Sequence, residues 1–298
     1  MPACPRGHGG VSCRLPVPQE PRVKLDFVQI VRDIPGAEGP CFDAAGRLFM
    51  VCPNRGQILQ VLGEGSARER ANTGGIPAGL FPDRDGGLWV ADMKLGILRC
   101  APDGRLEPIV AGFEDAPIRG CNDLCLDRRG ALYFTAPGGS GPERPVGEVF
   151  RRDAGGAVAR FGQGYAFPNG IAVRADASEL VVAETFTKAL WAFELAANGA
   201  VGPRRRFATL PGKHFGGPDG MDFDAEGNLL ATNWGAGTID VFARNGVLIE
   251  RIECPFDKPS NVHFGGGDGC DLYVTEHTTN GLWRTRWRCP GQPALGPR

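Results

Sequence analysis

The sequence lacks an apolar run long enough to cross a membrane as a helix, and it carries almost no net charge. Its 33 lysines and arginines are scattered along the chain and nearly balance 34 aspartates and glutamates. A nucleic-acid partner would require a basic face, so we expect no nucleic acid, no membrane and a small-molecule substrate. The first 22 residues hold no apolar stretch suited to a signal peptide, which favours a cytoplasmic protein.

The sequence also has no sustained helical period and no paired spacing among its 10 cysteines. Free thiols are therefore expected rather than a disulfide framework. Cys4, His8 and Cys13 could bind zinc in principle, but their Pro/Gly-rich surroundings favour an unstructured leader. We expect a disordered tail over residues 1–22, one domain over 23–288, and a second disordered tail over 289–298.

What the sequence does contain is one motif repeated six times, a turn followed by leucine and a short β-branched or aromatic run. The repeated leucines lie 40 to 49 residues apart, at Leu48, Leu88, Leu132, Leu180, Leu229 and Leu272. This spacing is the period of a β-propeller blade, and the 45 glycines gather at the turns between apolar runs. The pattern predicts an all-β, single-domain, six-bladed β-propeller with four antiparallel strands in each blade. We expect the chain to act as a monomer, with the segment 23–31 pairing with the last blade to close the ring.

One position precedes each repeated leucine by 10 to 12 residues, and it is occupied in turn by Glu38, Ala78, Asn122, Asn169, Asp219 and Ser260. Equivalent positions in radially arranged blades face the same way, so the four ligand-type side chains are predicted to meet at the axis. Two carboxylates in a narrow channel repel each other unless a proton or a cation lies between them. With two amide oxygens they form an all-oxygen set that suits Ca²⁺, and four protein oxygens leave coordination positions for a reactant.

A second interpretation of the same residues is that they are ordinary turn residues. Asn169-Gly170 and Asp219-Gly220 fit it, because Asn-Gly and Asp-Gly are common turn dipeptides. Glu38 and Asn122 do not, since glutamate has no special role in turns and Asn122 is followed by Asp123. The register shared by all four favours the metal site.

Further motifs resemble the diisopropylfluorophosphatase-like calcium-dependent phosphotriesterases, within the wider group of gluconolactonase and regucalcin propellers. They include GGIPAG (74–79), GCND (120–123), FPNGIAV (167–173), DGMDFD (219–224), KPSN (258–261) and VTEH (274–277). The resemblance implies a catalytic calcium held by Glu38, Asn122, Asn169 and Asp219. It also implies a second, structural calcium held by Asp222, the carbonyl of Val262 and His263, although a hydrogen-bonded pair inside the tunnel explains Asp222 and His263 as well.

The resemblance further implies which residues line the substrate pocket above the metal: Ile76, Met93, Phe167, Thr185, Trp234 and His277. Taken alone, Ile76, Met93 and Phe167 are more often core residues than pocket residues. His277 is either a general base or a hydrogen-bonded wall residue, and the wall is favoured. The loop 136–146 is shorter than in the family and offers Arg144 as the counterpart of an arginine over the site, so substrate choice transfers least well.

The predicted function is that of a calcium-dependent hydrolase that cleaves phosphotriester or phosphorus-fluorine bonds. Calcium acts as Lewis acid, and Asp219 acts as nucleophile or water activator. The alternative is a calcium-dependent lactonase that opens a sugar or small-molecule lactone. A scaffold propeller without catalysis is disfavoured, because the chain lacks the Trp-Asp signature and such a protein has no reason to place two carboxylates on its axis.

Overall fold

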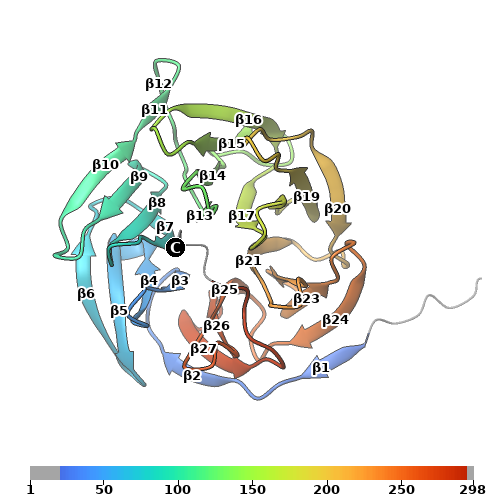
Figure 1. Ribbon diagram of the computed structural model, residues 1–298. Coiled ribbons are helices and arrows are strands. Elements are labelled where there is room, and N and C mark those ends of the chain that lie inside the picture. The colour runs from blue at the N-terminus through green and yellow to red at the C-terminus, as the bar shows by residue number, and fades with distance from the viewer. Residues whose placement is uncertain (1–20, 294–298) are drawn as a thin grey trace, which may run out of the picture.

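The computed structural model describes residues 21–293, in which the strands form six sheets arranged around a central axis (Figure 1). Within this range the helical structure is one short 3-10 segment, η1 (Pro53–Arg55). The prediction of an all-β, six-bladed propeller is confirmed. No helix among the described residues is long and apolar enough to cross a membrane.

In each blade the first strand lies at the axis and later strands lie progressively further out (Figure 1). Blade 1 contains β3 (Glu38–Phe42), β4 (Leu48–Cys52), β5 (Gln57–Gly63) and β6 (Ser66–Asn72). Blade 2 contains β7 (Pro77–Pro82), β8 (Leu88–Asp92), β9 (Gly96–Cys100) and β10 (Leu106–Val110). After the small hairpin of β11 (Gly112–Phe113) and β12 (Ala116–Pro117), blade 3 contains β13 (Leu124–Leu126), β14 (Leu132–Ala136), β15 (Gly147–Arg152) and β16 (Val158–Tyr165).

The remaining blades follow the same order. Blade 4 contains β17 (Pro168–Val173), β18 (Glu179–Glu184), β19 (Ala189–Glu194) and β20 (Arg205–Thr209). Blade 5 contains β21 (Pro218–Phe223), β22 (Leu229–Asn233), β23 (Thr238–Phe242) and β24 (Leu248–Glu253). Blade 6 contains β25 (Pro259–Gly265), β26 (Asp271–Glu276) and β27 (Gly281–Arg286).

The repeated leucines explain how the blades hold together. Each lies in the second strand of its blade, and each is buried in a different one of six apolar clusters. Each cluster joins residues of two neighbouring blades; the cluster around Leu180, for example, also contains Tyr133 and Val149 of blade 3. The hydrophobic core is therefore a ring of interfaces between blades, which fixes the direction in which every inner strand faces the axis.

The amino-terminal segment closes the ring, as predicted, but with two strands rather than one. β2 (Val28–Val31) pairs antiparallel with β27 and supplies the outer strand of blade 6. β1 (Arg22–Lys24) pairs in parallel with β24 of blade 5. The predicted tail boundary is thus wrong at Arg22, because this residue pairs with Arg251 across the ladder. The rest of that predicted tail, residues 1–20, lies outside the described residues, as do Cys4, His8 and Cys13.

The predicted carboxyl-terminal tail also begins too early. Gly291 forms a bridge with Asp224, and the Gln292 side chain accepts a hydrogen bond from the Ala175 amide (2.7 Å) and donates one to the Val173 carbonyl (2.9 Å). Residues 289–293 therefore belong to the folded body, since their polar groups bond to blades 4 and 5. Residues 294–298 lie outside the described range. The described cysteines are free thiols, as expected.

Candidate metal centre and active site

The predicted ligands lie at or just before the starts of inner strands. Glu38 opens β3, Asn169 and Asp219 are the second residues of β17 and β21, and Asn122 lies two residues before β13. Gly170 lies within β17, and a Cβ atom there would clash with the Asp219 carbonyl of the next blade. These Asn-Gly and Asp-Gly pairs are strand residues, and the turn interpretation is wrong. Their glycines are needed because neighbouring inner strands approach too closely for a side chain.

Hydroxyl groups fix the inner strands relative to one another. Threonines in or directly after the second strands donate hydrogen bonds to inner-strand carbonyls of the next blade. Thr135 bonds Asn169 (2.6 Å), Thr185 bonds Pro218 (2.8 Å) and Thr232 bonds Ser260 (3.0 Å). The sequence interpretation missed this role. Thr135 and Thr232 stand three residues after their repeated leucines, so the repeat register was the available signal.

Asp219 is the most electrostatically strained of the predicted ligands. Its side chain is buried, and burial, followed by the charges of Glu38 and Asp123, raises its pKa well above the ordinary value, while a hydrogen bond from Asn169 lowers it in part. Among the described residues, no lysine or arginine forms an ion pair with Asp219 or Glu38. The centre therefore concentrates carboxylate charge without a lysine or arginine among the described residues to balance it.

Asp123 adds a further buried carboxyl directly beside Asn122. Its Oδ1 accepts a hydrogen bond from the Leu124 amide (2.9 Å), and its Oδ2 accepts one from the Ile171 amide of blade 4 (3.2 Å). Burial raises the pKa of Asp123 to about 7, against the lowering effect of these two amides. Asn122 itself is held by the backbone, where its amide donates to the Thr135 carbonyl (3.0 Å).

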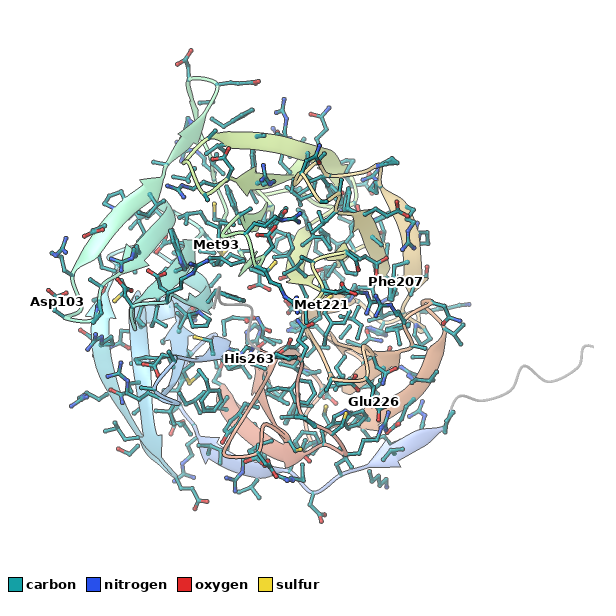
Figure 2. All side chains as sticks on the ribbon, in the orientation of Figure 1. Met93, Asp103, Phe207, Met221, Glu226 and His263 are labelled. Atoms are coloured by element: carbon teal, nitrogen blue, oxygen red, sulfur yellow. The ribbon has the colours of Figure 1, made fainter. Side chains whose placement is uncertain are left out.

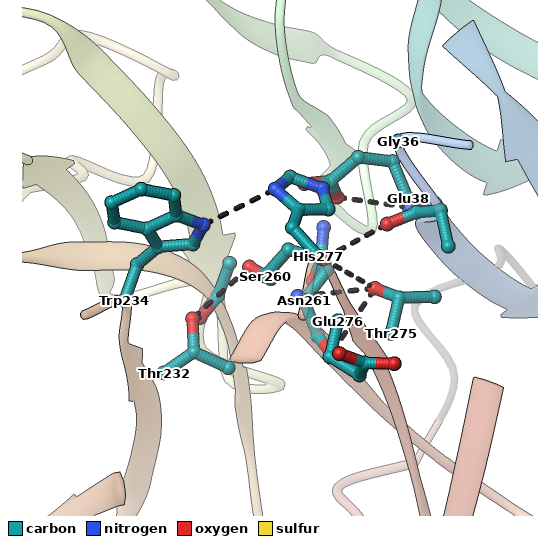
Figure 3. A network of polar contacts seen from close by, with 12 residues as sticks. Gly36, Glu38, Thr232, Trp234, Ser260, Asn261, Thr275, Glu276 and His277 are labelled. Atoms are coloured by element: carbon teal, nitrogen blue, oxygen red, sulfur yellow. Dashed lines mark hydrogen bonds and ion pairs between the residues drawn. The ribbon is translucent and has the colours of Figure 1, made fainter. Parts of the chain in front are cut away.

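Glu38 is held by His277, which in turn is oriented by Trp234 (Figure 3). The Trp234 Nε1–H donates to His277 Nδ1 (3.1 Å), which leaves Nε2 facing Glu38 Oε1 at 3.4 Å. Burial lowers the pKa of His277, but the nearby Glu38 carboxylate outweighs burial, so the pKa is raised. The indole donor occupies the Nδ1 lone pair, so the neutral imidazole carries its proton on Nε2, which faces Glu38 but is buried without a formed hydrogen bond. This arrangement favours a wall residue over a free general base.

Four of the six predicted pocket residues occupy one repeated position. Met93, Thr185, Trp234 and His277 each stand five residues after a repeated leucine, directly after the second strand of a blade. Ile76 accepts a backbone hydrogen bond from Met93 (2.8 Å), which places both at blade 2. Figure 2 shows Met93 close to the central axis and Asp103 at the outer rim. Among the described residues, no hydrogen bond or aromatic contact joins Ile76 or Met93 to the predicted pocket residues of blades 4 to 6.

Phe167 and Thr185 support Asn169 from blade 4. Asn169 Nδ2 donates to Thr185 Oγ1 (3.2 Å), which turns the amide oxygen away from that hydroxyl. Phe167 has a φ of 69°, an unfavourable value for a residue with a side chain. Its amide donates to Ser140 Oγ (3.0 Å) and its carbonyl accepts from Thr185 (3.0 Å), so this strained backbone is held on both sides. Ser140 belongs to the loop that the sequence predicted over residues 136–146, of which Ala136 is the last residue of β14.

A second cluster lies within the tunnel. A cavity of about 200 Å³ is lined by Asp123, by Asp222 and His263, and by Gln292 and Pro293. His263 Nδ1 lies 3.2 Å from Asp222 Oδ2, and that same oxygen accepts a hydrogen bond from the Phe264 amide (3.2 Å). Val262 is buried, and its amide donates to the Asn261 side chain (2.8 Å). The three residues predicted for a second calcium are thus neighbours, with a close Asp222–His263 contact among them.

Comparison with known proteins agrees with this geometry. Residues 36–278 match the model of the SMP-30/Gluconolactonase/LRE-like region. The chain belongs to this family. Within curated proteins it is 38% identical to a diisopropyl-fluorophosphatase from Loligo vulgaris, over 91% of this chain and 95% of the relative. It is also 31% identical to a pentonolactonase from Haloferax volcanii, over 80% of each.

Solved structures of the SMP-30/gluconolactonase family share the architecture. A gluconolactonase from Xanthomonas campestris superposes with a TM-score of 0.75 at 25% identity, covering 87% of this chain and 89% of the other. The predicted resemblance to diisopropylfluorophosphatase-like and gluconolactonase propellers is therefore confirmed. The curated relatives include both a phosphatase and lactonases, so membership of the family leaves the substrate class open.

For this member of the family, sequence reasoning missed two aromatic residues at the mouth. Phe186 follows Thr185, and its ring lies 5.6 Å from Phe167 and 5.6 Å from Phe215, measured between centroids. Phe215 lies in the connection that precedes β21, and its ring is 6.3 Å from that of Trp234. Neither residue stands at a repeated position occupied by other aromatics, so the repeat pattern carried no signal for them.

Proposed function

We propose that the protein is a calcium-dependent hydrolase whose catalytic calcium is held by Glu38, Asn122, Asn169 and Asp219. The observation that carries the proposal is the buried Asp219 carboxyl, which faces the charge of Glu38 with no lysine or arginine paired to either among the described residues. Two carboxylates and two amide oxygens are hard ligands of the kind that calcium prefers, whereas zinc and copper recruit histidine or cysteine. The donor set therefore fits calcium.

Bound there, calcium would supply Lewis-acid polarisation of the substrate's phosphoryl or carbonyl oxygen. Asp219 performs the chemistry from its own carboxylate, either by attacking the electrophilic centre or by taking a proton from an attacking water. In both versions one water is consumed. When Asp219 attacks, the fluoride or alkoxide leaves, and the water then cleaves the bond between Asp219 and the acid group; when Asp219 activates the water, the water displaces the leaving group directly. The protons of the water go to the departing fluoride or alkoxide and to the buffer.

The neighbouring side chains hold this carboxylate and its partners in place. Trp234 orients His277 toward Glu38, and Thr185 orients the Asn169 amide. Preorganised donors of this kind require no rearrangement during the reaction. His277 acts on Glu38 in this scheme, while proton transfer belongs to Asp219.

Phosphotriester or phosphorus-fluorine hydrolysis is the proposed activity, supported by 38% identity to the Loligo enzyme over nearly the whole chain. Phe167 and Trp234 offer apolar surface to alkyl groups rather than donors to sugar hydroxyls. A lactonase is the second candidate, supported by 31% identity to the Haloferax pentonolactonase over 80% of both chains. Both reactions develop negative charge on one oxygen, which the same centre stabilises.

We also propose that Asp222, His263 and the Val262 carbonyl hold a second calcium with a structural role. The tunnel cavity provides room beside the Asp222 carboxylate, and water is needed to complete the coordination. Histidine is a weak calcium ligand, and the Asp222–His263 contact is complete without a metal. Calcium is therefore expected to bind more weakly here than at the site of Glu38, Asn122, Asn169 and Asp219.

A parallel assay of the purified protein tests the proposal. Hydrolysis of diisopropyl fluorophosphate and of a panel of lactones is measured in calcium and after removal of calcium by a chelator. We expect both activities to fall on chelation and to return with added calcium, and their ratio to identify the substrate class. Activity that persists through chelation would exclude the calcium mechanism.

A further inference from the structure

An arc of five aromatic rings crosses blades 4, 5 and 6 at the mouth. Consecutive ring centroids are 5.6, 5.6, 6.3 and 6.5 Å apart, in the order Phe167, Phe186, Phe215, Trp234 and His277. Both ends of the arc meet the candidate metal centre. Phe167 stands two residues before Asn169, and His277 contacts Glu38.

The middle of this arc is exposed. Phe215 is 74% accessible to solvent, the largest exposure among the large hydrophobic residues described. A single exposed apolar side chain needs no explanation, but Phe215 is continuous with Phe186 and Trp234. An apolar surface that begins at the metal centre and ends in solvent is arranged as the wall of a substrate site.

The backbone around Phe215 is held firmly despite this exposure. Gly216 has a φ of 101°, and a Cβ atom there would clash with Trp234. A Cβ atom at Gly235 would clash with the Phe215 carbonyl. Lys188 Nζ donates to the Gly216 carbonyl (2.6 Å), which ties the segment to blade 4. The phenyl ring is therefore presented on a fixed backbone, which reduces the conformational entropy lost when a ligand binds against it.

We propose that Phe186 and Phe215 form an apolar subsite that selects substrates carrying an aryl or bulky alkyl substituent on the reacting phosphorus or beside the lactone carbonyl. This inference rests on the hydrolase function and names its substrate class. An aromatic substituent placed there contacts the edges and faces of two rings, and such contacts between aromatic rings stabilise binding. A small polar sugar lactone gains nothing from this part of the wall.

Matched substrate pairs test the subsite. One pair is para-nitrophenyl ethyl phenylphosphonate and its methylphosphonate analogue, and the other is γ-phenyl- and γ-methyl-γ-butyrolactone. For the class that the wild type hydrolyses, we expect a higher kcat/KM for the phenyl member. Phe215→Ala is expected to reduce the phenyl-to-methyl ratio of kcat/KM by about five- to tenfold, from the loss of one aromatic contact and its buried area.

Leu62→Ala is the matched control. Leu62 is 54% exposed and follows Val61, which pairs with Leu48 at the start of β4. Glu38 pairs with Val51 near the other end of β4, so Leu62 and Glu38 lie at different ends of blade 1. It should leave the ratio unchanged. A ratio that does not move in Phe215→Ala, or an equal fall for both members of a pair, overturns the subsite. Phe186→Leu, which keeps apolar packing beneath Phe215, should reduce the ratio in the same direction by a smaller factor.

A binding measurement separates failure of the subsite from failure of the hydrolase proposal. Dimethyl(phenyl)phosphine oxide and trimethylphosphine oxide carry the phosphoryl oxygen but have no group that can be hydrolysed. If the wild type cleaves neither substrate pair, the proposed function fails. The subsite is still supported if the phenyl oxide has a lower Kd than the trimethyl oxide in the wild type and loses that advantage in Phe215→Ala. Equal Kd values for the two oxides in the wild type overturn it.

Discussion

Two groups of residues along the axis balance their charges differently. The upper centre is the predicted calcium site of Glu38, Asn122, Asn169 and Asp219, and the tunnel cluster consists of Asp222, Val262 and His263. At the upper centre, Glu38 has His277 at 3.4 Å, but no lysine, arginine or histidine among the described residues forms an ion pair with Asp219, and the pKa of Asp219 is raised by burial and by its neighbours. In the tunnel, Asp222 has His263 at 3.2 Å and accepts hydrogen bonds from two backbone amides. A carboxylate with partners is stable as it stands, whereas one without them needs a cation or a proton. We therefore expect catalysis at the upper centre and a structural role for the tunnel cluster.

The largest expected effect comes from neutralising the upper carboxylate. Asp219→Asn retains an oxygen ligand but removes the nucleophile or base, so kcat/KM should fall by at least about 10³-fold. Its stability in chelator should not fall, because the substitution removes a charge that is costly to bury. Steady-state kinetics with thermal unfolding measure both. Hydrolysis that survives unchanged on both substrate classes would contradict the mechanism.

Stability of the calcium-free protein should depend on pH in the direction set by the upper carboxyls. The folded-state pKa values of Asp219 and Asp123 are raised, the latter to about 7, so the folded state binds more protons than the unfolded state above pH about 4. The free energy of unfolding is therefore highest below about pH 4 and falls as the pH rises through 7, by roughly 3 to 4 kcal/mol for Asp123 alone. Calcium affinity should rise over the same range.

Denaturant titrations in chelator at several pH values measure this slope. Asp123→Asn should flatten it, whereas Asp222→Asn serves as the tunnel control and should leave most of it in place. A slope of the opposite sign would show that the upper carboxyls are ionised and stabilised without calcium.

Glu38→Gln should weaken calcium binding without removing an oxygen ligand. Loss of one charge from the ligand set is expected to lower calcium affinity by about 10- to 100-fold. Calorimetric titration measures this, with Asp222→Asn as the comparison in the tunnel. If Asp222→Asn weakened the tighter site more than Glu38→Gln, the assignment of the two regions would be reversed.

The smallest expected effect is in the tunnel. His263→Ala removes the partner of Asp222 and a ring stacked on Phe42, so the free energy of unfolding should fall by about 1 to 3 kcal/mol. We expect kcat/KM to change by less than about threefold, because the tunnel cluster does not touch the reacting groups. A large loss of activity in a variant that remains folded would show that the two regions are coupled.

Much of the fold was predictable because every blade of a propeller has the same packing requirement. Each repeated leucine fills an interface between two blades, and this demand recurs at nearly constant spacing. The same register carried Glu38, Asn122, Asn169 and Asp219, and at a different offset Trp234 and His277. The predicted tail boundaries were wrong, because packing between blades does not decide where the ordered chain begins and ends. Arg22 and Gln292 are ordered through hydrogen bonds to distant strands, which composition does not reveal.

By itself the sequence determined the blade number, the inner strands and the oxygen-bearing residues at the axis, because these follow from periodicity and side-chain chemistry. Only the tertiary structure decided that Gly170 and Gly220 serve close packing rather than turns. It also decided that Trp234 directs His277 toward Glu38 and that the rings of Phe186 and Phe215 lie between those of Phe167 and Trp234. Each of these depends on contacts between blades, and pairs brought together by ring closure leave no local pattern in the chain.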